Sequence, residues 1–448
     1  MSLWEDKISP WVLASTADGA QSDFLVVLNA QADLSAAYSL PTKQARGRFV
    51  YATLWKTAQR EQAPLRAWLD AQGVPYRSFY IVNLIHVRAG DRALVEALAA
   101  HPDVARIEAN PRIHNARPRP QTYVTPSALH TIQSNIQQVN ADDVWGLGYT
   151  GQDIVIGGQD TGYAWNHPAL VNQYRGWDGS SVNHDYNWHD AVHSGGGSCG
   201  ADSPQPCDDH GHGTHTMGIA LGSDDSAHPL TATNAIGVAP DARWIGCRNM
   251  DVGDGTPATY LECFEFFLAP YPVNGTALLG NPDLAPDVTN NSWGCPPSEG
   301  CSWDTLQAAA EAHRAAGILT VSSAGNDGPS CSSVREPVAL YDATYTVGSV
   351  NGSDNIVSSS SRGPVTIDGS QRLKPNISAP GLSIRSSTRD GSYGFMSGTS
   401  MASPHVAGAV ALLWSAQPAL RGQLDQTQDI LNTAALPRYS TQCGDPAG

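Results

Sequence analysis

The 448-residue chain has no long apolar run, no CxxC pair of cysteines and no visible internal repeat. Its longest uncharged apolar stretch, residues 406–414, is far shorter than the ~20 residues that cross a bilayer, so no membrane span is expected. The absence of a repeat excludes solenoid and propeller arrays. The amino terminus lacks the basic start and apolar core of a secretory signal.

Basic residues are scarce, with 26 Lys and Arg against 42 Asp and Glu and a net charge of -16. Residues 1–116 hold 12 basic and 11 acidic residues, whereas the remainder holds 14 and 31. This asymmetry predicts a domain boundary near residue 116. An acidic main body argues against nucleic acid as a partner. It is compatible with bound structural calcium, although a solvated acidic surface is the favoured explanation.

The first 116 residues contain no cysteine, and all eight cysteines follow. Cys199 and Cys207, like Cys295 and Cys301, are close in loop-like sequence rich in Gly, Ser and Pro. An even number of cysteines in such loops predicts disulfides and an oxidising compartment. Buried free thiols are the alternative. The partners of Cys247, Cys263, Cys331 and Cys443 stay open.

The amino-terminal part has the pattern of a small α+β domain. Residues 1–21 are expected to be a loosely structured extension, and 113–130 a linker rich in proline and arginine. Between them the order is β-α-β-α-β. The predicted elements are strands 24–28, 76–87 and 104–107 and helices 42–72 and 91–101.

From about residue 131 to 448, buried β-branched runs alternate with helical stretches. This alternation predicts an α/β domain around a parallel sheet, where functional groups gather at the carboxyl ends of the strands. The predicted strands are 154–158, 244–247, 288–292, 318–322 and 345–350, and the helices are 214–222, 258–268 and 305–316.

Ser400 lies in a glycine-flanked turn immediately before the apolar helical run 406–414. The start of a helix favours negative charge, which suits a nucleophile. A serine hydroxyl also needs a base and a group that orients the base. His212, at a predicted helix start, and Asp160, at a strand end, are the candidates for these roles. Asn326, in a glycine turn, could donate its amide to an oxyanion.

Each of these residues has a simpler interpretation. Asp160 alone would be a turn aspartate, and Asn326 alone a turn residue of left-handed conformation. His210, His212 and His215 could together be metal ligands. A zinc hydrolase of that type usually has an aspartate where Thr214 stands, and Ser400 favours the acid–base–serine interpretation.

The segments Asp160-Thr161-Gly162, His212-Gly213-Thr214-His215 and Gly398-Thr399-Ser400-Met401-Ala402, in this order, resemble the subtilase family of serine peptidases. The resemblance implies a subtilisin-like α/β domain in which Asp160 orients His212, His212 is the base and Ser400 the nucleophile. It implies that Asn326 donates to the oxyanion. It also implies a substrate cleft lined by Ser292, Trp293, Gly294, Ser323, Ala324 and Gly325, with Gly253 and Gly255 on the opposite edge.

Residues 22–112 resemble the ferredoxin-like inhibitory prodomain of many subtilases, and the layout is most similar to the bacillopeptidase F-like branch. The resemblance implies a secreted, self-processing endopeptidase of proteins and peptides, inhibited by its own prodomain. We expect a monomer that needs no cofactor for catalysis.

Two features depart from the family pattern. An insertion at 178–208 is expected to be a surface loop or a cleft-shaping, calcium-binding element, stapled by Cys199 and Cys207. The carboxyl end at Gly448 looks truncated, because family members commonly continue further.

Overall fold

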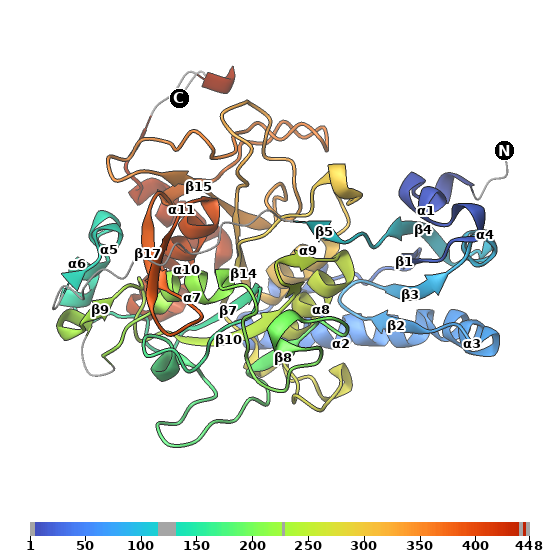
Figure 1. Cartoon of the computed structure of the whole chain (residues 1–448), viewed down its shortest axis with the longest axis horizontal. Helices are drawn as coiled ribbons and strands as arrows, with labels where there is room; N and C mark the ends of the chain where they lie inside the picture. Colours follow the sequence, from blue (N-terminus) through green and yellow to red (C-terminus); the bar gives the residue numbers. More distant parts are fainter. Residues whose placement is uncertain (1–4, 115–130, 226–228, 439–441, 445–448) are drawn as a thin grey trace.

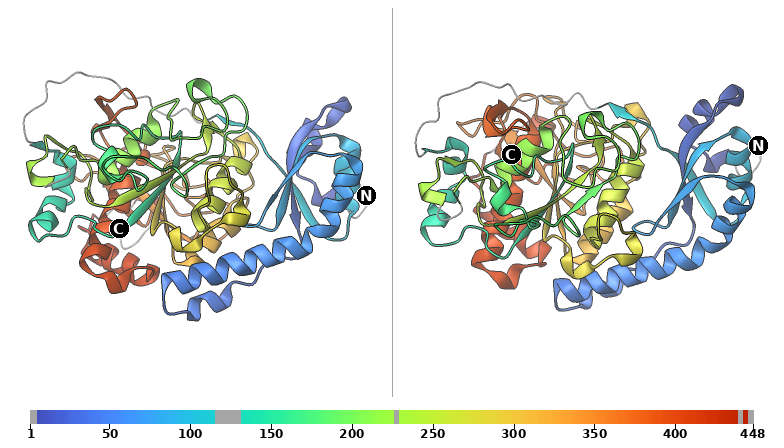
Figure 2. Two further views of the ribbon diagram at one scale, coloured as in Figure 1. Left: turned by 90° about the horizontal axis from the view of Figure 1, so that it is seen from below. Right: turned by 60° about the horizontal axis from the view of Figure 1, so that its bottom comes forward.

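The computed structural model describes residues 5–114, 131–225, 229–438 and 442–444. Within these ranges the chain forms a small amino-terminal unit beside a larger α/β domain (Figures 1 and 2). The predicted linker 113–130 lies outside the described residues, except for its first two residues.

The amino-terminal unit is an antiparallel sheet in the order β2-β3-β1-β4, with helices packed against it. Its helices begin and end where the sequence supplies caps: the side chains of Thr42 and Asp91 accept backbone N–H groups, and Gly73 adopts the left-handed conformation. The elements are α1 (Pro10–Ser15), β1 (Ser22–Leu28), α2 (Lys43–Glu61), α3 (Ala63–Gln72), β2 (Tyr76–Phe79), β3 (Leu84–Gly90), α4 (Arg92–Ala100) and β4 (Val104–Ala109).

Two predictions for this unit are wrong. Residues 5–21 are ordered, because Ile8 and Val12 are buried against the sheet. The strand predicted over 76–87 is a hairpin, so the order is β-α-β-β-α-β with α3 continuing the helical segment. Its turn, residues 80–83, is apolar like a strand but is buried against the larger domain.

The larger domain is built on a parallel sheet in the order β16-β15-β14-β13-β7-β10-β8. Strands β13 and β14 are buried along their whole length, as expected for a sheet covered on both faces. The strands are β7 (Val155–Asp160), β8 (Trp188–Asp190), β10 (Arg243–Arg248), β13 (Val288–Asn291), β14 (Leu319–Ser323), β15 (Thr344–Val350) and β16 (Ile377–Pro380).

Helices cover both faces of this sheet. Helices α7 and α10 pack together in one apolar cluster, and α8 and α9 belong to another, which also includes α2 of the amino-terminal unit. The helices are α5 (Ser134–Gln138), α6 (Ala141–Gly146), α7 (His212–Leu221), α8 (Pro257–Leu268), α9 (Gln307–Ala316), α10 (Thr399–Ala416) and α11 (Leu424–Ala434). None of the helices within the described ranges is long and apolar enough to cross a membrane.

Three smaller sheets are also present within the described ranges. They are β11 (Met250–Asp251), β12 (Asp254–Gly255) and β5 (Ile113–His114) in one sheet, β17 (Ile384–Ser387) with β18 (Tyr393–Met396), and β6 (Thr131–Ile132) with β9 (Asn234–Ala235).

The cysteines form four disulfides, which confirms the two local pairs and adds Cys247–Cys263 and Cys331–Cys443. The insertion 178–208 is more than a surface loop, because its strand β8 extends the central sheet beside β10. Trp188 on this strand is fully buried.

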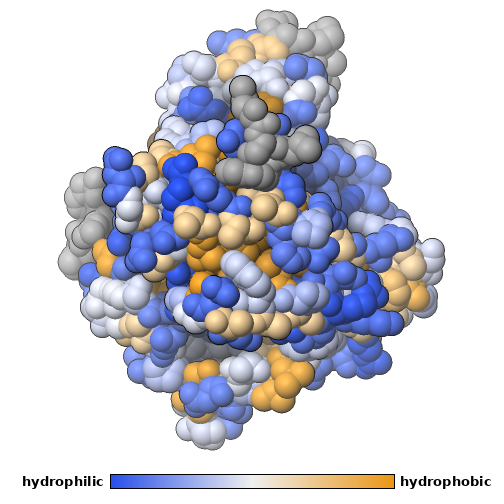
Figure 3. All heavy atoms as spheres, turned by 90° about the vertical axis from the view of Figure 1, so that its right-hand side faces the viewer, coloured by the Kyte–Doolittle hydropathy of each residue, from blue (hydrophilic) through white to orange (hydrophobic). Residues whose placement is uncertain are grey.

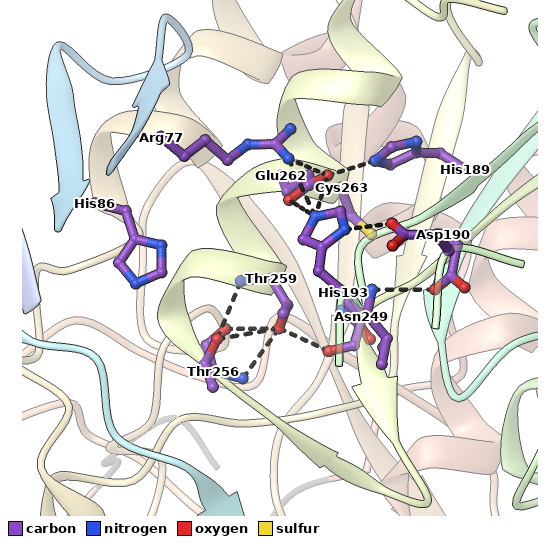
Figure 4. A network of polar contacts seen from close by, with 12 residues as sticks. Arg77, His86, His189, Asp190, His193, Asn249, Thr256, Thr259, Glu262 and Cys263 are labelled. Carbon is purple, nitrogen blue, oxygen red and sulfur yellow. Dashed lines mark hydrogen bonds and ion pairs between the residues drawn. The ribbon is translucent and has the colours of Figure 1, made fainter. Parts of the chain in front are cut away.

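Within the described ranges, the amino-terminal unit contacts the larger domain through several elements, including α2, the hairpin β2-β3 and the segment that ends in β5. Helix α2 lies along α9, where the Arg46 guanidinium donates to the carbonyls of Arg314 and Ala315 at the end of that helix. The hairpin β2-β3 packs on α8, where Arg77 pairs with Glu262 at 2.8 Å (Figure 4). Strand β5 joins β12.

The outer face of the amino-terminal unit has a mixed surface, with hydrophilic residues around a smaller apolar area (Figure 3).

Candidate active site

The fold brings the predicted acid, base and serine into the larger domain's core from three separate elements. Asp160 is the last residue of β7, His212 is the first residue of α7, and Ser400 is the second residue of α10. All three are buried. The helix starts before the serine, so Ser400 lies within the first turn of α10 rather than ahead of it.

Asp160 and His212 are in direct contact. His212 Nδ1 lies 2.7 Å and 2.9 Å from the two carboxylate oxygens of Asp160, and the backbone N–H of Thr161 also donates to that carboxylate. A carboxylate accepts only, so this contact places the imidazole proton on Nδ1 and leaves Nε2 as the basic nitrogen. Nε2 has no hydrogen-bond partner among the described residues.

The Ser400 hydroxyl is turned toward the end of β13. Its Oγ donates to the carbonyl of Ser292 at 3.3 Å, and Ser292 Oγ donates to the carbonyl of Ser400 at 2.9 Å. No hydrogen bond between Ser400 and His212 is present among the described contacts. A rotation about the serine χ1 moves the hydroxyl between staggered positions, and catalytic hydrogen bonds often form only with substrate bound.

Asn326 lies beside the start of α10. Its side-chain oxygen accepts from the backbone N–H of Thr399 at 3.0 Å and from the Thr399 hydroxyl at 3.2 Å. These bonds identify which side of the Asn326 amide carries the oxygen. The NH₂ group therefore points away from Thr399 and can donate to another group. Gly398 has φ +148, and a Cβ there would lie only 3.3 Å from the Asn326 oxygen. A glycine thus allows Asn326 to approach the helix start.

The two segments predicted to line the cleft leave adjacent parallel strands. Asn291 of β13 is paired with Ser322 of β14, so residues 292–294 and 323–325 emerge at the same edge of the sheet. Trp293 is 3% exposed, and its ring stacks on that of Tyr260 of α8 with the ring centroids 4.1 Å apart. The Trp293 side chain thus packs against α8. That residues 292–294 line the substrate cleft stays a prediction.

The predicted opposite edge of the cleft is paired with the end of the amino-terminal unit. Strand β5 runs antiparallel to β12, with Ile113 opposite Gly255 and His114 opposite Asp254. Ile113 is fully buried, and Arg112 Nε lies 2.8 Å from a carboxylate oxygen of Asp254. Gly255 has no room for a side chain, since a Cβ would lie 2.5 Å from the Tyr260 ring. Strand β5 of the same chain therefore occupies this edge.

The comparisons with known proteins agree with this geometry. Residues 151–446 match the model of the Subtilase family. The chain belongs to the subtilase family.

Its relatives include serine peptidases of several bacilli. Bacillopeptidase F of Bacillus subtilis (strain 168) is 32% identical over 97% of this chain, which spans only 31% of the length of that relative. The Thermophilic serine proteinase of Bacillus sp. (strain AK1) is 31% identical over 78% of this chain and 73% of its own length. Subtilisin DY of Bacillus licheniformis is 31% identical over 65% of this chain and 87% of its own. These relatives support serine endopeptidase activity.

The histidine cluster of this subtilase does not converge as a set of metal ligands. His215 is buried and its Nε2 lies 3.1 Å from the carbonyl of Gly394, while burial lowers its pKa to about 3. His212 faces Asp160 instead. Across the described ranges, no three His, Cys, Asp or Glu side chains lie close enough together to hold a metal ion. The expectation of structural calcium therefore stays a prediction without assigned ligands.

Asp208 supports the site and was not predicted from the sequence. Its carboxylate accepts hydrogen bonds from the backbone N–H groups of His210 and Gly211, from Thr214, and from the Thr161 hydroxyl. It therefore ties the turn after β7 to the start of α7. Its position two residues ahead of His210 was the available signal in the sequence. Its partners, however, come from both the turn after β7 and the start of α7.

Proposed function

We propose that this chain is a serine endopeptidase that hydrolyses peptide bonds through Asp160, His212 and Ser400. The observation that carries the proposal is the buried contact of Asp160 with His212 Nδ1, which leaves Nε2 basic in a chain of the subtilase family. Asp160 holds the imidazole in this tautomer and stabilises its protonated form.

The reaction begins when Ser400 Oγ turns from the Ser292 carbonyl toward His212 Nε2. His212 takes the hydroxyl proton while Oγ bonds to the peptide carbonyl carbon. The imidazolium then gives its proton to the leaving amine as the C–N bond breaks. Water repeats the sequence on the acyl-enzyme, with His212 again as base, and releases the carboxylic acid.

The oxyanion of the tetrahedral intermediate is held by the Asn326 side-chain NH₂ group and the backbone N–H of Ser400. The bonds from Thr399 to the Asn326 oxygen support this role, because they orient the amide before substrate arrives. Preorganised donors of this kind need no rearrangement during the reaction. No cofactor takes part in these steps.

Residues 22–112 act as an inhibitory prodomain, preceded by an extension at 1–21 and followed by a linker at 113–130 that carries the processing site. The peptidase domain is 131–448. The β5–β12 pairing supports this division, since β5 directly follows residue 112 and occupies an edge predicted to bind substrate. The first substrate is then the enzyme's own chain.

After processing, the enzyme acts on proteins or peptides as a monomer outside the cell. The four disulfides support an oxidising location. Ser292, Gly294, Ser323, Ala324 and Gly325 bind substrate on one side of the cleft, together with the backbone of Trp293, and Gly253 and Gly255 bind it on the other.

A serine-directed phosphonate tests this function. Mass spectrometry of the processed protein is expected to find the label on Ser400, in parallel with loss of peptide hydrolysis. Ser415→Ala, a change on the same helix remote from its start, is the matched control and should label normally. Hydrolysis that survives complete labelling, or that is abolished only by a chelator, would instead support a metallohydrolase.

A further inference from the structure

Glu336 places its carboxylate against the proposed substrate-binding segment. A Cβ added to Gly294 would lie 1.7 Å from Glu336 Oε2 and 3.0 Å from its carboxyl carbon. Only the absence of a side chain at Gly294 therefore allows this approach. Glu336 lies in the connection between β14 and β15. It follows Gly294 by 42 residues in the sequence.

This contact is close to the proposed nucleophile. Gly294 is two residues after Ser292, whose carbonyl lies 3.3 Å from Ser400 Oγ. Successive Cα atoms are about 3.8 Å apart, so Gly294 lies within about 8 Å of Ser292 along the chain. A substrate side chain next to the scissile bond and four to six atoms long has the length to cover such a distance.

The residues proposed to line this part of the cleft carry no charge, and the Glu336 carboxylate lies against one of them, Gly294. Gly294, Ala324 and Gly325 have no side chain or only a methyl group, so backbone forms most of the lining. The neighbouring Arg335 directs its guanidinium to Asp327, at 3.6 Å. Arg335 and Asp327 therefore offset each other's charge.

We propose that Glu336 determines substrate specificity by favouring lysine or arginine immediately before the scissile bond. The proposal rests on the proposed endopeptidase function and names its substrate class. The substrate's methylene groups lie along the backbone of Gly294 and Gly325, and its ammonium or guanidinium group donates to the Glu336 carboxylate. Charge-assisted hydrogen bonds of this type are stronger than neutral ones and are lost when the substrate side chain is uncharged.

The test compares kcat/KM of the processed enzyme on peptides that differ only in the residue before the scissile bond: Arg, Lys, Gln, Leu or Glu. The wild-type enzyme is expected to prefer Arg and Lys over Leu and Gln, and to cleave the Glu peptide least. In Glu336→Gln, the preference for Arg over Gln should fall about 10- to 100-fold, while cleavage of the Leu peptide changes little.

Asp327→Asn is the matched control, because it removes an equal charge from a neighbouring residue that is exposed, whereas Glu336 is partly buried. It should reduce the preference for arginine far less than Glu336→Gln. A wild-type enzyme that cleaves the Leu peptide as well as the Arg peptide would overturn the proposal without any variant. So would equal effects of the two substitutions.

Phosphonate titration of active sites accompanies each measurement. It corrects kcat/KM for the fraction of a variant that is folded and active. It also distinguishes a failure of the Glu336 assignment from a failure of the proposed endopeptidase function. If Ser400 is labelled but charge before the scissile bond has no effect, the assignment of Glu336 fails and the endopeptidase function stands. If Ser400 is not labelled in the wild-type enzyme, the proposed function itself fails.

Discussion

Glu265 is predicted to make binding of the amino-terminal unit dependent on pH. It lies on α8 and is 2% exposed, and its Oε2 accepts the backbone N–H groups of Tyr80 at 2.8 Å and Ile81 at 3.3 Å. Burial raises the pKa of Glu265 to about 7, against the opposing effects of Arg77 and these two N–H groups. Release of the unit exposes this face of α8 and should return the carboxyl to its ordinary pKa of about 4.5.

The sign follows from proton linkage. The bound state holds the Glu265 proton more tightly than the released state, so binding is strongest below about pH 4.5 and weakens as pH rises through about 7. For pKa values of about 7 and 4.5, the dissociation constant should increase about 30-fold between pH 5.5 and pH 8, or about 2 kcal/mol. His193 nearby has its pKa raised to about 9, chiefly by Glu262, so it stays protonated over this range.

The assay is inhibition of the processed enzyme by its released amino-terminal fragment at pH 5.5 and pH 8. Glu265→Gln keeps a side-chain oxygen for the Tyr80 N–H group but cannot titrate, and its inhibition constant should vary much less with pH. The reasoning is refuted if wild-type inhibition is equally strong at both pH values. It is also refuted if Glu265→Gln keeps the full dependence, which would assign the effect to another group at the interface.

Two further substitutions and the removal of two disulfides test the site and the fold. Asp160→Asn should lower kcat by about 10⁴-fold, because an amide does not enforce the required imidazole tautomer; a loss under tenfold in titrated enzyme would contradict the role of Asp160. Asn326→Ala should lower kcat by about 10²- to 10³-fold with little change in KM, and a change confined to KM would argue against oxyanion binding. Removing Cys331–Cys443, which spans 112 residues, should lower the free energy of unfolding by about 5 kcal/mol, against about 2–3 kcal/mol for Cys199–Cys207, which spans 8. Denaturant titration measures both losses, and equal losses would contradict this ordering.

The sequence predicts five of the seven strands of the central sheet, all but β8 and β16, and places Asp160, His212 and Ser400 at element ends, because these features depend on local signals. Buried β-branched runs mark the strands, and glycine turns mark the ends where the proposed catalytic side chains stand. The two local disulfides are predictable for the same reason, since Cys199 and Cys207 are separated by eight residues.

The features that the sequence does not predict depend on contacts between distant segments. The turn at 80–83 interrupts a strand-like run because it packs on α8, and Ile8 is ordered by its pairing with Ile107. Asp208 joins two separate turns. The approach of Glu336 to Gly294 likewise exists only once β13 and the connection after β14 lie together.

Conversion of the purified precursor tests the central claim most directly. If Ser400 is the nucleophile and the linker is its first substrate, the wild-type chain of 47.4 kDa should convert to about 35 kDa, the mass of about 320 residues. The Ser400→Ala chain, purified and incubated in the same way without other peptidases, should stay at full length. Conversion of Ser400→Ala at the wild-type rate would contradict the assignment of Ser400.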